Sequence, residues 1–490
     1  MDLVFTTSPT RSHNNQNLLN MTHNFHPTII RAYDIRGIYN DTLKDEDAYF
    51  IGKSFASFLA KNDKKRVSVG CDGRISSPAL KAELIKGLTE SGIEVIDVGV
   101  GPTPMLYFSV YHLETEAGIM VTGSHNPKNH NGFKMMLKER PFFGDDIIGL
   151  ANIAKEADFV VGEGTVETFD IREDYAERLL KDCDLSDLNL GERSPKRQLR
   201  IAWDNGNGAA GDIMTRISER IDAEHLLLYS DIDGTFPNHH PDPTVPENLK
   251  DLKKAVLEQE CDLGIAFDGD GDRIGIMDDR GEILWGDQIM VFFAREVLKT
   301  HPKATIIADV KASEVLFKEI AKAGGKPLMW KTGHSLVKAK MKETNSPLAG
   351  EMSGHIFFAD KYYGFDDALY AAVRMINIVF ALKDNLSLAK RSMGKTFSTP
   401  EIRVKCSEER KFAIVDELKA NLKASNIEFN DVDGVRVNVE NGWWLIRASN
   451  TQAVLVARCE ASSHKYLKEL KANLQKQLEF CKVEIPKELK

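Results

Sequence analysis

The chain has 490 residues, and 64 lysines and arginines against 73 aspartates and glutamates give it a formal net charge of −9. This acidic balance argues against a nucleic-acid binder that works by bulk electrostatics, because such domains are usually basic. The sequence contains no run of about 18 apolar residues, which argues against a membrane span.

The chain begins with "MDLVFTTSPTRSHNNQNLLNMTHN", which lacks the basic start and apolar core of a secretory signal. Its content of Asn, Thr and Ser predicts a disordered extension over residues 1–24, with the fold beginning near Phe25. Six cysteines form no CxxC pair, which is typical of free thiols in a reducing compartment. We therefore expect a cytoplasmic protein.

Three short β-rich runs each end in an aspartate, namely "RVSVGCD" at Asp72, "LRIAWD" at Asp204 and "TIIAD" at Asp309. A helix-compatible segment follows each run, and this alternation predicts parallel α/β sheets. The last hundred residues instead predict an α+β unit, with Asn441-Gly442 as the turn of a hairpin. We therefore predict three related α/β domains and a smaller C-terminal α+β domain. Their predicted bounds are 25–168, 169–284, 285–394 and 395–490.

The stretch "VTGSHNPKNHNGFK" places Ser124 directly after a predicted buried strand. Ligands of α/β sheets bind at the carboxyl ends of strands, so Ser124 is a candidate nucleophile. Neighbouring side chains of an extended chain point to opposite sides, which predicts that His125 is poorly placed to act as its base. From this stretch alone a turn serine and a nucleophile both stay open.

The stretch "DGDGDR" follows another apolar strand and places Asp268, Asp270 and Asp272 on a two-residue spacing. Glycines let the backbone curl so that three carboxylates converge, and all-oxygen ligands suit Mg²⁺. An EF-hand loop is excluded because its glycine and glutamate positions hold Arg273 and Asp279. The alternative to a metal site is an ordinary Asp-Gly surface turn. Arg273 adds a positive charge beside the three aspartates, which suits a bound phosphate.

Three further polar stretches are "KTGHSL", "GEMSGH" and "RASNT". Glu351 and Ser353 in the second stretch could bind vicinal hydroxyls. Arg447 to Thr451 in the third form a candidate phosphate cradle. Taken alone, "KTGHSL" and "GEMSGH" are more typical of solvated loops, and "RASNT" could equally be a polar hairpin. Near the start of the fold, "RAYDIRG" adds two arginines and a tyrosine.

Taken in order along the chain, these six motifs resemble those of the α-D-phosphohexomutases, and the resemblance extends from about Phe25 to the end. It implies three related α/β domains and a smaller fourth domain around a central active-site cleft. It also implies an intramolecular phosphotransferase that uses one Mg²⁺ and a hexose 1,6-bisphosphate as intermediate and activator. Asn450 and Met352 favour the mannose/glucose branch over the phosphoglucosamine mutases.

The resemblance also implies a role for each motif residue. Ser124 would carry the phosphoryl group, and a phosphoserine oxygen would join Asp268, Asp270 and Asp272 on the metal. The other catalytic residues would be Arg36, Lys134, Arg273 and His355. The substrate-binding residues would be Tyr33, Lys311, His334, Glu351, Ser353, Arg447, Ser449, Asn450 and Thr451.

Two alternative functions stay open from the sequence. One is a phosphoglucosamine mutase, and the other is a metal-dependent phosphatase with a serine nucleophile, which would release inorganic phosphate. We expect sugar phosphates as partners, with no nucleic acid and no membrane. We expect a monomer, with a dimer as the alternative.

Overall fold

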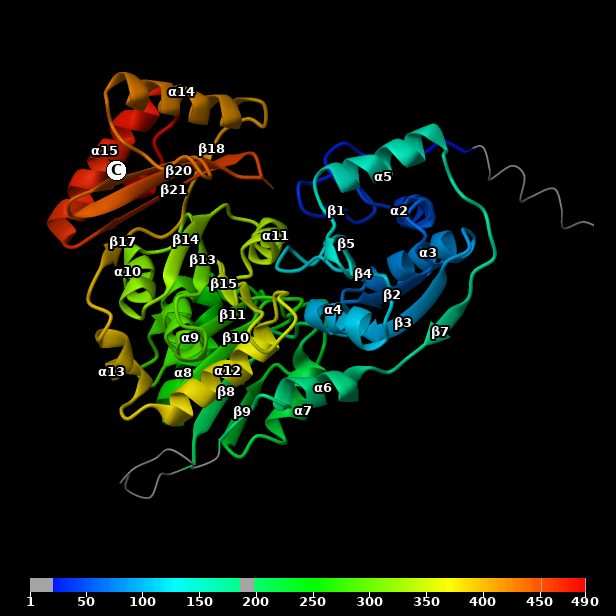
Figure 1. The fold of residues 1–490 in the computed structure, drawn as a ribbon, viewed down its shortest axis with the longest axis horizontal. Helices are drawn as coiled ribbons and strands as arrows, with labels where there is room; N and C mark the ends of the chain where they lie inside the picture. The colour runs from blue at the N-terminus through cyan, green and yellow to red at the C-terminus, as the bar shows by residue number, and fades with distance from the viewer. Residues whose placement is uncertain (1–20, 186–197, 451, 490) are drawn as a thin grey trace, which may run out of the picture. The chain divides into compact units, whose positions relative to one another are not determined.

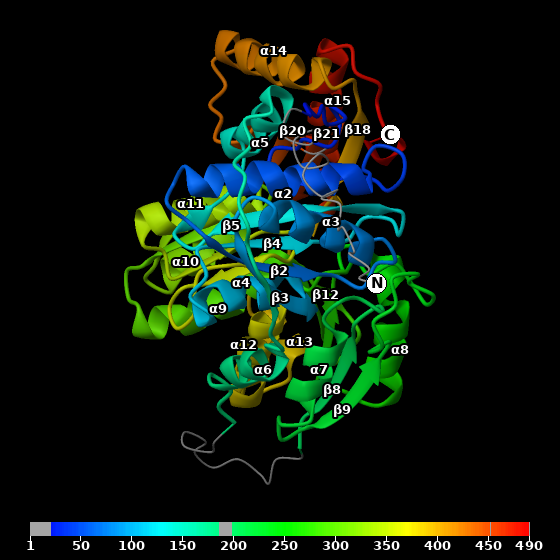
Figure 2. The same cartoon turned by 90° about the vertical axis from the view of Figure 1, so that its right-hand side faces the viewer.

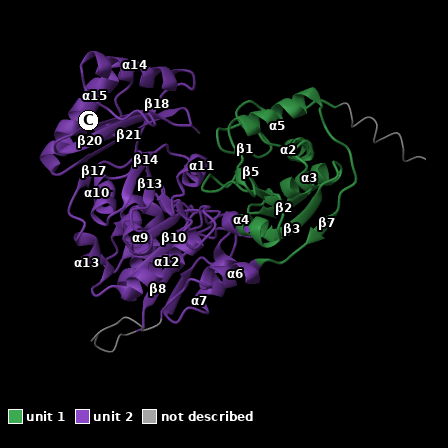
Figure 3. Cartoon of the chain, viewed as in Figure 1, with its two compact units in different colours: residues 1–100, 106–171 green, residues 101–105, 172–490 purple. Residues whose placement is uncertain are grey.

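A computed structural model describes residues 21–185, 198–450 and 452–489. These form two compact units, one made of residues up to 100 and 106–171, the other of residues 101–105 and 172–490 (Figure 3). Most of the predicted extension, residues 1–20, lies outside the described residues. Contacts begin before Phe25, because the His23 ring stacks on Phe50 with 4.3 Å between ring centroids.

One mixed sheet forms the first unit. Its order is β1 (Ile35–Ile38), β5 (His130–Leu137), β4 (Ala117–Val121), β2 (Arg66–Cys71), β3 (Glu94–Val100) and β7 (Val166–Thr168), with β6 (Arg140–Pro141) also paired to β5. Strands β4, β2, β3 and β7 are parallel, whereas β5 is antiparallel to β4 and β1. Its helices are α2 (Asp45–Ala60), α3 (Ser77–Thr89), α5 (Asp145–Glu156) and α4 (Thr103–His112), of which residues 103–105 belong to the second unit.

Helices α2 and α3 cross at two glycines. A Cβ atom on Gly52 would lie 2.4 Å from the carbonyl oxygen of Leu84, and one on Gly87 would lie 2.2 Å from that of Tyr49. Larger residues would push the helices apart. The two helices share one hydrophobic core with strands β2 and β4.

The second unit repeats the strand plan of the first. One sheet is β9 (Glu224–Leu228), β8 (Arg200–Asp204), β10 (Leu263–Phe267), β11 (Ile274–Asp278) and β12 (Ile283–Leu284). The next is β14 (Lys326–Trp330), β13 (Thr305–Asp309), β15 (Leu348–Gly350) and β16 (Ile356–Phe358). In both, as in β3-β2-β4-β5, three parallel strands are followed by one antiparallel strand. The prediction of three related α/β units is confirmed by this repeated order.

Helices cover these two sheets (Figure 1), and α7 and α8 lie on opposite sides of β8 and β9 (Figure 2). The helices are α6 (Arg172–Leu180), α7 (Gly211–Ser218), η1 (Pro246–Leu249), α8 (Lys250–Glu258), α9 (Gly286–Thr300), α10 (Glu314–Lys322), α11 (His334–Thr344), α12 (Ala368–Ala381) and α13 (Leu386–Arg391). Within the described ranges, no helix has both the length and the apolar character needed to cross a membrane.

The last sheet is antiparallel, as predicted for an α+β unit. Its order is β17 (Phe397–Ser398), β21 (Val454–Ala461), β20 (Gly442–Ala448) and β19 (Val435–Val439), with β18 (Ile402–Lys405) also on β21. Helices α14 (Arg410–Ala424) and α15 (His464–Phe480) cover one face, and η2 (Lys487–Leu489) follows (Figure 1). The predicted hairpin is present, but Val439 pairs with Gly442, so the turn is Glu440-Asn441.

Candidate active site

The three motif loops occupy the same place in the three repeats, because each joins the third parallel strand to the antiparallel fourth. Ser124 lies between β4 and β5, Asp268 to Asp272 between β10 and β11, and Glu351 to His355 between β15 and β16. In two repeats, the aspartate at the carboxyl end of β2 or β13 accepts a hydrogen bond from the backbone of the motif loop. Asp72 accepts the backbone N–H of Gly123 at 3.0 Å, and Asp309 accepts that of Met352 at 3.2 Å.

Ser124 has left-handed backbone geometry, with a φ of 49°. Its Oγ lies 3.1 Å from Nδ1 of His125. The expectation that the two side chains point apart is therefore wrong, because it assumed an extended chain. Residues other than glycine seldom adopt positive φ, and such strain persists only where the surroundings enforce it.

Arg74, which was not among the predicted site residues, holds this loop in its conformation. Its guanidinium donates to the carbonyl oxygens of Ser124 (2.6 Å), Asn126 (2.7 Å), Pro127 (2.6 Å) and His130 (3.0 Å). Asp72 balances its charge, with Oδ2 accepting from Nε of Arg74 at 3.2 Å.

Gly123 is required beside this arginine. A Cβ atom at that position would lie 2.4 Å from the Arg74 guanidinium. The pattern "CDGR" places Arg74 two residues after Asp72, which is compatible with their ion pair but gives no signal for the bonds to the Ser124 loop.

The three aspartates of the second motif converge. One carboxylate oxygen of each lies within 4.8 Å of the others, and all three side chains are buried. Oδ1 of Asp268 accepts the backbone N–H groups of Asp272 and Arg273, both at 3.1 Å, and Oδ2 of Asp270 accepts the hydroxyl of Thr103 at 2.5 Å. Buried like charges at this separation are costly unless a cation joins them, so these side chains fit a hard divalent ion.

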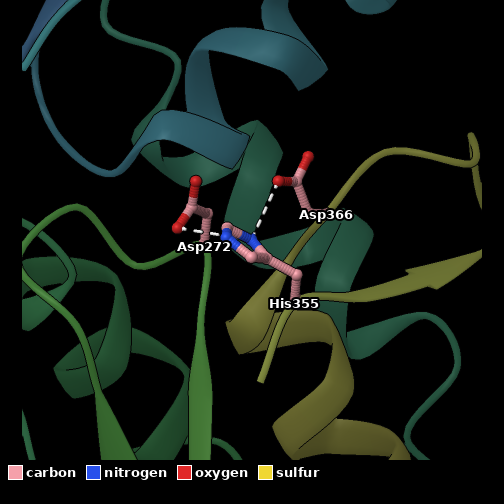
Figure 4. A group of neighbouring side chains, drawn as sticks. All are labelled: Asp272, His355 and Asp366. Carbon is pink, nitrogen blue, oxygen red and sulfur yellow. Dashed lines mark ion pairs between the residues drawn. The ribbon is translucent and has the colours of Figure 1, made fainter. Parts of the chain in front are cut away.

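His355 lies between two carboxylates (Figure 4). Its Nδ1 is 3.1 Å from Oδ2 of Asp366 and 3.6 Å from Oδ1 of Asp272. Nε of Arg273 donates to Nε2 of His355 at 2.9 Å. Because an arginine nitrogen can only donate, Nε2 carries a lone pair, and the ring proton lies on Nδ1, facing the carboxylates.

Asp366, which the sequence did not single out, joins both predicted histidines. Nδ1 of His334 lies 3.6 Å from its Oδ2, and Nζ of Lys338 donates to its Oδ1 at 2.9 Å. Burial alone would raise the pKa of Asp366, but Lys338, His355 and His334 together hold it well below its ordinary value. Asp366 is therefore a carboxylate at neutral pH.

The loops "KTGHSL" and "GEMSGH" meet at Glu351. Its Oε1 accepts the backbone N–H of Gly333 at 2.5 Å, and its Oε2 accepts the hydroxyl of Ser353 at 3.3 Å. Glu351 is almost completely buried. Both oxygens of the carboxylate are thus held by protein donors.

The predicted phosphate cradle follows β20. Nε of Arg447 donates to Oδ2 of Asp433 at 2.8 Å, and the same oxygen accepts the backbone N–H of Thr332 at 2.9 Å. Ser449 Oγ accepts the backbone N–H of Gln452 at 3.2 Å. Thr451 lies outside the described residues.

The predicted site residues divide between the units. The first unit carries Tyr33, Arg36, Ser124 and Lys134. The second carries Asp268, Asp270, Asp272, Arg273, Lys311, His334, Glu351, Ser353, His355, Arg447, Ser449 and Asn450. In the first unit, Arg36 pairs with Asp34 at 2.5 Å, and Lys134 is buried on β5.

Family models match the chain in four consecutive parts. They are the phosphoglucomutase/phosphomannomutase alpha/beta/alpha domains I (residues 27–160), II (173–281) and III (285–396) and the C-terminal domain (401–477). The chain belongs to the phosphoglucomutase/phosphomannomutase family. This confirms the predicted fold class and the enzyme class, an isomerase that transfers a phosphoryl group within its substrate.

Relatives match over nearly the whole chain. A phosphomannomutase/phosphoglucomutase of Pseudomonas putida is 43% identical over 92% of this chain and 95% of the relative. A phosphoglucomutase of Neisseria gonorrhoeae is 41% identical over 89% of this chain and 93% of the relative. The crystal structure of a phosphoglucomutase/phosphomannomutase family protein from Burkholderia thailandensis has a TM-score of 0.86 and 41% identity, covering 93% of this chain and 98% of that one.

Proposed function

We propose that the chain interconverts the 1-phosphates and 6-phosphates of mannose and glucose, using phosphorylated Ser124 and a hexose 1,6-bisphosphate intermediate. The observation that carries the proposal is the buried cluster of Asp268, Asp270 and Asp272, which occupies in the second repeat the place that Ser124 occupies in the first. Membership of the phosphoglucomutase/phosphomannomutase family supports the same reaction.

In the first half-reaction, a free hydroxyl of the hexose 1-phosphate attacks phosphoserine 124. The sugar oxygen bonds to phosphorus as the bond between phosphorus and Ser124 Oγ breaks. The hydroxyl proton passes to a base, and the departing Oγ takes up a proton to become the serine hydroxyl. The bisphosphate then turns round, and Ser124 takes back the other phosphoryl group. Positioning and charge stabilisation supply most of the catalysis in such transfers.

His355 is the proposed base. Its Nε2 holds the lone pair, and its Nδ1–H faces Asp366 and Asp272, which would stabilise the imidazolium that forms. Arg273 must leave Nε2 for this step, and turning its guanidinium toward the transferring phosphoryl group would do so. Lys134 and Arg36 would add positive charge from the first unit.

Asp268, Asp270 and Asp272 would hold one Mg²⁺, with an oxygen of phosphoserine 124 as a further ligand. When bound, the ion would neutralise charge on the transferring phosphoryl group. The hydrogen bonds to Asp268 and Asp270 orient these carboxylates before an ion arrives. This ordering lowers the cost of assembling the site.

The remaining residues would bind the substrate through its phosphate and only some of its hydroxyl groups. Glu351 and Ser353 would bind two sugar hydroxyls, and Arg447 with its neighbours would bind the phosphate that is not being transferred. The proposed substrate contacts are Tyr33, Lys311, His334, Glu351, Ser353, Arg447, Ser449, Asn450 and Thr451. Few hydroxyl contacts would let the site accept two substrate orientations and both epimers.

One experiment tests the proposal. The protein is supplied with mannose, glucose or glucosamine 1-phosphate, with hexose 1,6-bisphosphate as activator, while 6-phosphate and inorganic phosphate are measured and intact mass reports phosphoserine. We expect 6-phosphates of mannose and glucose and a protein heavier by one phosphoryl group. Release of inorganic phosphate without 6-phosphate would instead identify a phosphatase. A preference for glucosamine 1-phosphate would identify a phosphoglucosamine mutase.

A further inference from the structure

Glu401 lies against a residue of the proposed substrate site, although the proposed mechanism gives it no role. Its Oε2 is 3.1 Å from Nζ of Lys311, and its Oε1 is 3.8 Å from Nε of Arg403. Asp309 is farther from the same ammonium, at 3.7 Å. Glu401 is thus the nearest carboxylate to Lys311 among the ion pairs of the described residues.

The register of the last sheet explains why Glu401 lies there. Val456 on β21 pairs with Arg403 on β18 and with Arg447 on β20, so the two arginines flank it on one face of the sheet. Glu401 precedes Arg403 by two residues, and alternate residues of an extended chain share a face. The intervening Ile402 belongs to the core on the other face. One face therefore brings Glu401 and the cradle arginine Arg447 together.

The ion pair is charged throughout the neutral range. Lys311, with further help from Arg403 and Arg447, outweighs burial and lowers the pKa of Glu401 to about 2. Burial alone would lower the pKa of Lys311, but Glu401 is the first of the carboxylates that raise it. A buried ammonium needs a counter-charge, and Glu401 supplies it.

The backbone around Lys311 is fixed by two arginines of the same sheet. Arg436 donates to the carbonyl oxygens of Val310 (2.7 Å) and Ala312 (2.8 Å), and Arg458 donates to that of Lys311. The Arg436 guanidinium in turn packs on Trp443, 3.8 Å from the ring centroid. A change of partner at Lys311 would therefore involve its side chain and leave its backbone in place.

We infer that Glu401 is an internal anion that pairs with Lys311 when no phosphate is bound and gives way to the phosphate of the substrate. The inference rests on the proposed function, because it takes Lys311 and Arg447 as phosphate-binding cations. A carboxylate in this place weakens the hold on a dianion. It also gives Lys311 a partner each time the phosphate leaves. The phosphate must leave when the bisphosphate turns round between the two half-reactions.

The test is the binding of inorganic phosphate and of glucose 1-phosphate to the full chain by calorimetry, for the wild type and Glu401→Gln. Removing one negative charge a few ångströms from a dianion should tighten both Kd values about tenfold. Glu319→Gln is the matched control, since Glu319 also accepts from a cation, Arg295, at 2.5 Å, and it should leave both Kd values unchanged. Equal or weaker binding in Glu401→Gln would overturn the inference and identify Glu401 as a rigid support of Lys311.

Two further measurements separate the possible failures. If Arg447→Ala weakens binding of both ligands but Glu401→Gln does not tighten it, only the inference about Glu401 fails. If the wild type binds neither ligand, the proposed function and this inference both fail. Should Glu401→Gln not fold, carboxyl resonances of ¹³C-labelled wild type replace it, with Glu401→Asp used for assignment. The Glu401 resonance should move as phosphate is added, and a resonance that stays in place would overturn the inference.

Discussion

Arg74 donates a 2.6 Å hydrogen bond to the carbonyl oxygen of Ser124, although the two residues lie on different loops of the first sheet. The same guanidinium bonds to three further carbonyl oxygens of the loop, and it is almost completely buried. A planar group with five donors is suited to hold several carbonyl groups at once. The positive φ of Ser124 is thus imposed by a neighbouring loop, and Arg74 is a positioning residue for the proposed nucleophile.

Arg74→Lys keeps the charge beside Asp72 but removes most of the bonds to the loop. We expect kcat to fall at least tenfold while KM for sugar phosphates changes less than twofold, because Arg74 contacts the loop and not the substrate in the proposed mechanism. Steady-state kinetics with intact-mass analysis of phosphoserine would measure this. Lys81→Met is the matched control, because Lys81 pairs with Asp97 at 2.8 Å in the same unit and should leave kcat intact. A normal kcat in Arg74→Lys would show that the loop keeps its geometry unaided.

Ser124→Ala should abolish mutase turnover and the mass increase of the phosphoenzyme. The free energy of unfolding should change by only about 1 kcal/mol, because the change removes a hydroxyl that bonds to His125 and leaves the backbone bonds of the loop in place. Activity, intact mass and urea denaturation would be measured together. Ser109→Ala removes another buried hydroxyl of the first unit, one that donates to the carbonyl oxygen of Leu106 at 2.6 Å, and should keep full turnover. Turnover by Ser124→Ala would remove Ser124 from the mechanism.

Asp270→Asn should weaken Mg²⁺ binding at least tenfold, since one of three anionic ligands becomes neutral. Without metal, the same change should raise the free energy of unfolding by roughly 1 kcal/mol, because it relieves repulsion among buried carboxylates. Calorimetry would give the Kd for Mg²⁺, and thermal unfolding with a chelator would give the stability. Loss of stability without metal would indicate that the hydrogen bond from Thr103 outweighs the repulsion.

The sequence predicted the repeated α/β plan because each of the three repeats contains an apolar run that ends in Asp72, Asp204 or Asp309, and such patterns are local. The motif loops could be predicted for the same reason. The partners Arg74 and Asp366 could not, because each is a single polar residue whose role depends on a loop distant in sequence. The placement of His125 was mispredicted because nothing in the sequence indicates that Ser124 adopts a positive φ, which is usual only for glycine.

Asp367 gives a prediction of pH dependence outside the proposed site. It is the N-cap of α12, accepting the backbone N–H of Tyr370 at 2.9 Å and the hydroxyls of Tyr175 (2.9 Å) and Tyr362 (2.8 Å). Burial raises its pKa from 3.8 to about 6, and these donors only partly offset that effect. The folded protein therefore binds this proton more tightly than the unfolded chain does.

The direction of the pH dependence follows from this difference in pKa between the folded and the unfolded chain. Stability from Asp367 is complete below the unfolded pKa, near 4, and is lost as the pH rises to about 6. The free energy of unfolding of the wild type minus that of Asp367→Asn should thus fall by about 2–3 kcal/mol between these pH values. Urea denaturation across the range would measure it. Asp233, whose pKa the backbone and side chain of Thr235 lower from 3.8, should give the opposite slope for Asp233→Asn, and only at pH values below about 4. A difference for Asp367 that stays level with pH would mean that folding leaves the pKa of this carboxyl unchanged.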